Sequence, residues 1–231
     1  MKTKEKLSDN HKIHQRYIST LTGIEYPGGS TIAGLLDKGF GMVISAVSLT
    51  KKGYDFQKIW NEKKEAGTLL HDMIRGELIN HKFDMSSYTP AMTERATNSF
   101  SKFLKWESEH IIEDMFCEEQ IISETLKAGG TADLRAIIDK FKTLADYKSG
   151  KINKKTGKPY EASFVQASGY AKIEEENGHP IDRILLLCLP QDKEDNLLAY
   201  YLTDKERYVY TNIFVKLCGI YWDRCELQED K

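Results

Sequence analysis

The stretch that decides the expected fold is GTADLRAIIDKFKTLADYK, from Gly130 to Lys148. Its first part alternates in polarity from Ala132 to Ile138, which predicts a strand. One face of this strand would carry Asp133, Arg135 and Ile137. Its second part begins at Lys142 and predicts another strand, whose one face would carry Leu144, Asp146 and Lys148. The sequence therefore predicts a hairpin that presents two carboxylates and a lysine.

This hairpin has the residue types that phosphodiester hydrolysis needs. If the strands pair, Asp133 can approach Asp146, and the two carboxylates can hold a divalent cation. Lys148 would stand beside the cation, where it could orient an attacking water or stabilise the charge that builds on a phosphate. Scattered charges on a surface hairpin are the alternative, because D-x-K is a common pattern.

Three other positions add to this pattern. His71 lies in a helical segment from Ala66 to Asn80 and shares a face with Gly67, which leaves room for a ligand one turn earlier. A packed core histidine is the alternative. Gln166 and Tyr170 are four residues apart on a helix expected over 162–175, so both present hydrogen-bonding groups on one face. Glu119 lies 14 residues before Asp133 in a strand expected over 111–122, with a solvated glutamate as the alternative.

The order His, Glu, G-x-x-D, D-x-K, Q-x-x-x-Y resembles the PD-(D/E)XK nuclease superfamily, in particular its RecB-like branch. That branch includes the nuclease domains of bacterial recombination helicases, the CRISPR adaptation nucleases and the mitochondrial genome maintenance exonuclease. The resemblance covers roughly Tyr26 to the C-terminus. It implies an α/β fold with a restriction-endonuclease-like core, in which helices flank a mixed central sheet and helical additions precede it.

The resemblance also implies roles for individual residues. The metal ligands would be His71, Asp133, Asp146 and the main-chain carbonyl of Tyr147. Lys148 would be the catalytic lysine, acting with Asp133 and Asp146. The helix that supports the site and the DNA strand would contribute Gln166 and Tyr170, while Glu119 matches an acidic position of less certain role. Imidazole and carboxylate ligands suit Mg²⁺ or Mn²⁺.

Some members of this branch carry an iron–sulfur cluster on four cysteines, three of them near the C-terminus. This chain has four cysteines without a C-x-x-C pair, at Cys117, Cys188, Cys218 and Cys225. Cluster ligation needs several thiolates that converge on one point, so we expect no iron–sulfur cluster. Ordinary thiols favour a reducing compartment over a disulfide framework.

A lysine-rich segment follows the D-x-K strand and carries no acidic residue from 151 to 158. The candidate contacts to DNA phosphates here are Ser149, Lys151, Lys154, Lys155 and Lys158. Aromatic and basic residues between Tyr54 and Lys64, among them Trp60 and Lys63, could line a single-strand channel, with packing as the alternative.

Composition bounds the domain organisation and the class of protein. Hydrophobic residues make up 40% and charged residues 29% of the 231 residues, which is ordinary globular content. We expect one nuclease domain over 1–231, with a polar arm or helix over 1–25, a helical part over 26–110, and the sheet core with a C-terminal helix over 111–231. The net charge of −2 counts against a protein that coats DNA nonspecifically. No signal-peptide core or membrane span is evident, so we expect a cytoplasmic protein without a membrane partner.

Several smaller elements have recognisable patterns. Ser30 or Thr31 could begin a short helix, and Phe40 to Leu49 predicts a short buried helix. Thr89 before Pro90 predicts a helix start. Ile184 to Leu189 predicts a buried central strand, and Thr203 with Glu206 predicts a capping box for the last helix.

The expected function is divalent-metal-dependent hydrolysis of DNA, with single-stranded or frayed ends as the expected substrates. The exonuclease preference and a role in DNA repair, recombination or replication come from the resemblance alone, as does a phage origin, which would place the protein in the host cytoplasm. One alternative is a structure-specific endonuclease of the same fold. The other is a non-catalytic module that binds DNA or a partner.

Overall fold

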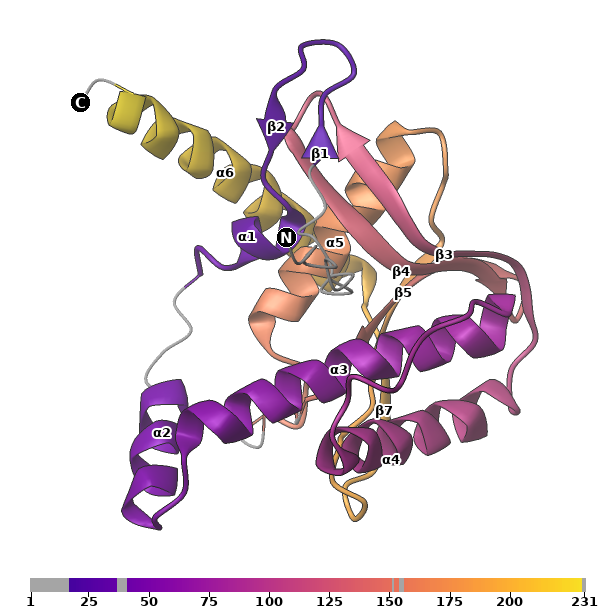
Figure 1. Cartoon of the computed structure of the whole chain (residues 1–231). Helices are drawn as coiled ribbons and strands as arrows, with labels where there is room; N and C mark the ends of the chain where they lie inside the picture. The colour runs from indigo at the N-terminus through magenta and orange to yellow at the C-terminus, as the bar shows by residue number, and fades with distance from the viewer. Residues whose placement is uncertain (1–16, 37–40, 151, 154–155, 230–231) are drawn as a thin grey trace, which may run out of the picture.

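A five-stranded mixed sheet forms the centre of the computed structural model, which describes residues 17–36, 41–150, 152–153 and 156–229. The strands follow the order β3-β4-β5-β6-β7 across the sheet (Figure 1). Their bounds are β3 (Ile112–Ser123), β4 (Ala128–Ile138), β5 (Phe141–Lys148), β6 (Arg183–Cys188) and β7 (Leu198–Tyr201). The helices are α1 (Gly29–Ala33), α2 (Gly41–Lys51), α3 (Phe56–Ile79), α4 (Pro90–Glu107), α5 (Glu161–Glu176) and α6 (Asp204–Glu229).

The sheet combines an antiparallel meander with one parallel pair. Strand β4 runs antiparallel to both β3 and β5, and Leu134 of β4 pairs with Ala145 of β5. Helix α5 then crosses over so that β6 runs parallel to β5, and β7 closes the sheet antiparallel to β6. The expected α/β fold, with a mixed central sheet flanked by helices, is confirmed.

Helices cover both faces of the sheet. One apolar cluster joins α1, α5 and α6 to the sheet, around residues such as Ile32, Phe164 and Phe214. The other joins α3 and α4 to the opposite face, around Leu70 and Phe103. Figure 1 shows α3 and α4 passing side by side in front of the sheet. Strand β6 is buried throughout except for its first residue, which confirms the expected central strand.

Local sequence signals define where three helices begin. Asp55 caps α3 by accepting a hydrogen bond from the main-chain N–H of Lys58, at 3.1 Å. Thr89 caps α4 ahead of Pro90, as expected. Thr203 and Glu206 form the expected capping box, in which each side chain bonds to the main-chain N–H of the other.

Most of the polar arm or helix expected over 1–25 lies outside the described residues, which begin at residue 17. Instead of an arm or helix, the described part forms a two-stranded antiparallel hairpin of β1 (Tyr17–Ile18) and β2 (Glu25–Tyr26), at the top of Figure 1. Tyr17 explains this hairpin, since its ring packs on Gly129 of β4, where a Cβ atom would lie 2.5 Å from the ring. A long-range contact of this kind has no local sequence signal.

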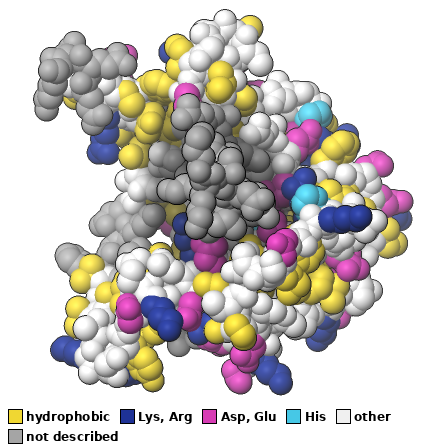
Figure 2. Space-filling view, viewed as in Figure 1, with side chains coloured by type: hydrophobic (Ala, Val, Ile, Leu, Met, Phe, Trp, Pro, Cys, Tyr) yellow, Lys and Arg dark blue, Asp and Glu magenta, His cyan; other side chains and the backbone are white. Residues whose placement is uncertain are grey.

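Two expectations for the first helices are also wrong. Gly28, rather than Ser30 or Thr31, is the cap of α1. The expected helix near Phe40 exists as α2, but it is not buried, because Val43 and Ile44 are 56% and 66% exposed. Hydrophobic side chains appear at this corner of the molecule, at the lower left of Figure 2. Among the described residues, no helix has the length and apolar character to cross a membrane.

Candidate metal and catalytic site

The candidate site lies where β4 and β5 diverge. Their last paired residues are Leu134 and Ala145, so the next rung would set Asp133 opposite Asp146. At this point the side chain of Asp133 takes the place of a strand partner, and its Oδ2 accepts a hydrogen bond of 2.7 Å from the main-chain N–H of Tyr147. The expected hairpin therefore forms, and Asp133 marks the fork between its strands.

The simple alternation predicted for β4 breaks at Asp133. Ala132 belongs to the apolar cluster on the α5 face, whereas Leu134 and Ala136 belong to the cluster on the α3–α4 face. Asp133 thereby reaches α3, while Arg135 contacts α5 through Glu174. Asp133 and Arg135 were expected to share a face of the strand. This expectation is wrong, because Asp133 contacts α3 and Arg135 contacts α5.

Three side chains from separate elements converge at the fork. Nδ1 of His71, on α3, lies 3.4 Å from Oδ1 of Asp133 and 3.4 Å from Oε1 of Glu118, on β3. One ligand atom from each residue lies within 4.8 Å of the other two. The backbone of Glu118 adopts a positive φ of 55°, where the pairing of β3 with β4 skips one rung. An imidazole and two carboxylates form a donor set that could hold a divalent metal ion.

The electrostatics of these residues favour a positive charge between the carboxylates. Burial lowers the pKa of His71, but the charge and hydrogen bond of Asp133, followed by those of Glu118, outweigh it and raise the pKa to about 10. The pKa of Asp133 is lowered, because the opposing effect of burial is overcome by the charge of His71. An ionised carboxylate facing an imidazolium is an arrangement in which a divalent cation can replace the proton.

Lys148 lies beside this cluster and is held by two contacts. Its Nζ lies 2.7 Å from Oδ2 of Asp146, a side chain that is 2% exposed, and 3.3 Å from Oε1 of Gln166. Burial raises the pKa of Asp146 to about 6. Burial lowers the pKa of Lys148, but the charge of Asp146 outweighs it, so the pKa is raised and the ammonium stays protonated.

The glutamine–tyrosine pair on α5 supports the lysine. Nε2 of Gln166 donates a hydrogen bond of 3.1 Å to the hydroxyl of Tyr170, which fixes the side-chain oxygen of Gln166 toward Lys148. The ring of Tyr170 rests on Gly130, where a Cβ atom would lie only 2.2 Å from the ring. The glycine of G-x-x-D is therefore required for close packing of the tyrosine of Q-x-x-x-Y.

The structure brings together some of the expected ligands and separates others. His71 and Asp133 meet, whereas the carboxylate of Asp146 pairs with Lys148 and lies outside the three-residue cluster. Tyr147 contributes its main-chain N–H to Asp133, and its ring packs edge-on against His71 with centroids 5.9 Å apart.

Glu118 occupies the place expected for Glu119. The carboxylate of Glu119 bonds to Arg135 at 2.8 Å and so points to a different partner. No local sequence signal distinguishes Glu118 from Glu119. The strand register does so, because the neighbouring pairs Cys117–Leu134 and Glu119–Ala132 place Glu118 opposite Asp133.

The lysine-rich segment is described only in part. Lys151, Lys154 and Lys155 lie outside the described residues, so their predicted DNA contacts stay predictions. The expectation that no acidic residue neutralises the segment is wrong for Lys158, whose Nζ lies 3.0 Å from Oε1 of Glu206. This glutamate belongs to the last helix and is 48 residues away in the chain, which sequence proximity does not reveal.

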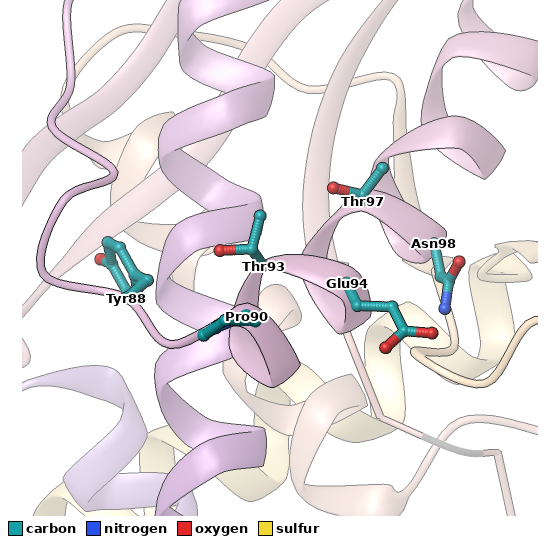
Figure 3. A pocket seen from close by; sticks show the side chains of 6 residues that line it. All are labelled: Tyr88, Pro90, Thr93, Glu94, Thr97 and Asn98. Carbon is teal, nitrogen blue, oxygen red and sulfur yellow. The ribbon is translucent and has the colours of Figure 1, made fainter.

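A shallow cavity of about 460 Å³ elsewhere on the surface contains none of these residues. It lies at the start of α4 and is lined by Tyr88, Pro90, Thr93, Glu94, Thr97 and Asn98 (Figure 3). Its lining has a single carboxylate, from Glu94, and no histidine, cysteine or lysine. We assign no chemistry to it.

The similarity of this chain to known proteins is low. No protein-family profile matches the sequence, and no curated protein does. One similar solved structure is a crystal structure from Eubacterium rectale named as a "Putative exonuclease", with 13% sequence identity and a TM-score of 0.45. The match covers 65% of this chain and 64% of that chain. The function proposed below rests on the site itself.

Proposed function

We propose that this chain is a single-domain, divalent-metal-dependent deoxyribonuclease that hydrolyses DNA phosphodiester bonds. The observation that carries the proposal is the fork of β4 and β5. There a donor set of one imidazole and two carboxylates stands next to the Asp146–Lys148 pair. The residues fall in the order of the motifs that resemble the RecB-like branch of the PD-(D/E)XK nucleases.

His71, Glu118 and Asp133 would hold the cation, with Asp146 and the carbonyl of Tyr147 as further predicted ligands. A bound Mg²⁺ or Mn²⁺ would supply Lewis-acid polarisation of a phosphoryl oxygen. The chain itself supplies a second positive charge, the ammonium of Lys148. Preorganised charge of this kind stabilises the transition state, because it needs no reorientation as the reaction proceeds.

Each neighbour of Lys148 has a part in placing that charge. Asp146 keeps the lysine protonated, and Gln166 fixes its direction by accepting a hydrogen bond from Nζ. Tyr170 in turn holds Gln166. Lys148 can thus stabilise the charge on the phosphate or orient the attacking water from a fixed position.

A cleavage assay with two substrates, end-labelled linear single-stranded DNA and circular single-stranded DNA, tests the proposal. We expect linear DNA to be degraded with Mg²⁺ or Mn²⁺ and to stay intact with a chelator. We further propose that the enzyme acts as an exonuclease on single-stranded or frayed ends, in DNA repair, recombination or replication. This preference and a phage origin of the protein rest on the resemblance alone. Cleavage of circular DNA would favour the endonuclease alternative, and binding without cleavage would favour the non-catalytic one.

A further inference from the structure

A groove of about 330 Å³ opens beside the end of β5. We call it the strand groove, and it is lined by Trp60, Lys63, Lys64, Ser149, Gly150, Gln191 and Asp192. Three segments meet in it, namely α3, the residues after β5 and the residues after β6. Because Ser149 directly follows Lys148, the groove adjoins the proposed catalytic lysine.

Gln191 lines this groove and carries an acceptor without a donor in the described part of the chain. The side chain is 8% exposed, and its Nε2 donates a hydrogen bond of 2.8 Å to the main-chain carbonyl of Lys63. This bond fixes which end of the amide is oxygen, since the reverse orientation would set two oxygens together. The buried Oε1 has no donor among the residues that the structure describes. Buried acceptors of this kind are normally bonded, so Oε1 would bond to an N–H group that enters the groove once the side chain turns toward it.

The walls of the groove offer an aromatic face and positive charge. The ring of Trp60 is 42% exposed and is supported from one side by Phe56, with centroids 5.9 Å apart. Lys63 and Lys64 are exposed on the next turn of α3. An aromatic face for stacking, an acceptor for N–H and two ammonium groups for phosphates together match the chemistry of a nucleotide in a single strand.

We propose that the strand groove binds an unpaired nucleotide of the substrate, with the base on Trp60, a base N–H on Oε1 of Gln191, and flanking phosphates at Lys63 and Lys64. The inference rests on the proposed function and names the substrate form that it selects. Every base has an N–H on its pairing edge, and that edge is accessible only when the base is unpaired. The groove therefore selects single-stranded over double-stranded DNA.

Helix α3 sets the distance between the groove and the candidate metal site. Trp60 and His71 are 11 residues apart on this helix, which corresponds to about 16 Å along its axis. A stacked strand advances about 3.4 Å per nucleotide, so about five nucleotides would join the two sites. Strands shorter than this cannot occupy both.

Binding of fluorescently labelled single strands of about 4 to 12 nucleotides, measured by anisotropy in the presence of a chelator, tests the inference. We expect Trp60→Ala and Gln191→Leu each to weaken binding of the longer strands by about tenfold. Both variants should bind an abasic strand of the same length as the parent does, because that strand offers neither a base face nor a base N–H. Unchanged binding of the normal strand by folded Trp60→Ala protein would overturn the inference.

Paired lysine variants test the phosphate contacts. Changing Lys63 and Lys64 to Gln should flatten the slope of log affinity against log salt by about 1.4, or about 0.7 per contact. The matched control changes Lys140 and Lys142, at the opposite end of β5, and should leave the slope as it is. Equal slopes for both pairs would overturn the role of Lys63 and Lys64.

The outcomes separate this inference from the proposed function. If the protein binds single strands through Trp60 but cuts no DNA with any metal, the proposed nuclease activity is overturned and the role of the strand groove stands. If Trp60→Ala cleaves short and long overhangs with metal as the parent does, the role of the strand groove is overturned and the proposed nuclease activity stands. Equal affinity of the parent for single-stranded and blunt double-stranded DNA also overturns the groove.

Discussion

Strand β4 carries two charged clusters that differ in their charge balance. The first, which we call the cation site, consists of His71, Glu118, Asp133, Asp146 and Lys148. The second, which we call the β4 anchor, consists of Glu119, Arg135, Glu174 and His179. Asp133 and Arg135 are two residues apart on the same strand, and their clusters face different helices.

Each carboxylate of the β4 anchor has a basic partner within the anchor. Arg135 bonds to Glu174 at 3.2 Å and to Glu119 at 2.8 Å, and Nδ1 of His179 lies 2.7 Å from the second oxygen of Glu174. Glu174 is fully buried. When His179 is protonated, the two carboxylates face one guanidinium and one imidazolium, so the charges within the anchor balance.

The cation site has an excess of negative charge. Its three carboxylates face one ammonium and one imidazole, so one carboxylate is in excess even when His71 is protonated. Nearly the same residue types can thus tie a helix to a sheet or bind a cation. The charge balance decides between these roles, since a buried cluster must be neutralised by its own residues, by protons or by a bound ion.

The largest effect on stability is expected in the β4 anchor. Arg135→Met leaves the buried carboxylate of Glu174 with His179 alone, and removing one partner of a buried pair costs about 3 to 5 kcal/mol. Urea unfolding followed by circular dichroism would measure the loss. Cation affinity of the folded variant should stay close to that of the parent, because Arg135 contacts none of the proposed ligands.

The matched control for the anchor is Glu119→Gln. This carboxylate is 38% exposed, so its bond to Arg135 should contribute less than about 1 kcal/mol. A loss for Arg135→Met as small as that for Glu119→Gln would contradict the view that the anchor is a structural tie. A parallel loss of Mn²⁺ affinity would show that the two clusters are not separate.

The next effect concerns the reaction. Lys148→Ala should slow cleavage by about 100-fold or more, by analogy with the removal of one preorganised charge-stabilising donor. Cleavage of end-labelled DNA gives the rate, and anisotropy with the same DNA should show nearly unchanged binding. Lys142→Ala, at the other end of β5, is the control. Parent-like turnover by Lys148→Ala would remove this lysine from the mechanism.

Two neighbouring glutamates sharpen the comparison further. Glu118→Gln removes one proposed ligand charge and should weaken Mn²⁺ binding by at least about tenfold, whereas Glu119→Gln should leave it unchanged. Calorimetric titration of both variants measures the difference directly. If Glu119→Gln weakens binding and Glu118→Gln does not, the assignment of the β3 ligand is reversed.

The sequence predicted the elements whose signals are local. Alternation identified β4 and β5, a short apolar run identified β6, and side chains four residues apart identified the Gln166–Tyr170 face of α5. Caps at Thr89 and Thr203 were equally local. These elements could be recognised because period and capping depend on residues within one or two turns.

The sequence could not predict what depends on contacts between distant segments. The choice of Glu118 over Glu119 follows from strand register and from a positive φ that a non-glycine residue rarely adopts. The pairing of Lys158 with Glu206 and the hairpin held by Tyr17 join segments far apart in the chain. Asp133 leaves its expected face because β4 and β5 separate there, which the alternation of the strand does not reveal.

The last prediction concerns protons at the cation site. Without a cation, the charges of Asp133 and Glu118 raise the pKa of His71 to about 10, although burial opposes them. A raised pKa stabilises the fold fully below the unfolded value of 6.5, and this contribution is lost as the pH rises through about 10. The Tm of the cation-free protein should therefore fall over this range because of His71.

Cation affinity should move in the opposite direction, because His71 must release its proton to become a ligand. Between about pH 7 and 8.5 the affinity for Mn²⁺ should rise about tenfold per pH unit, with about one proton released per cation. Calorimetry in two buffers of different ionisation enthalpy counts that proton. His110→Gln is the control, because His110 is also paired with an aspartate, its Nδ1 lying 2.6 Å from Oδ2 of Asp139, and this change should leave the proton count unchanged. His71→Gln should abolish the release, and a proton count that persists in this variant would show that another group gives up the proton.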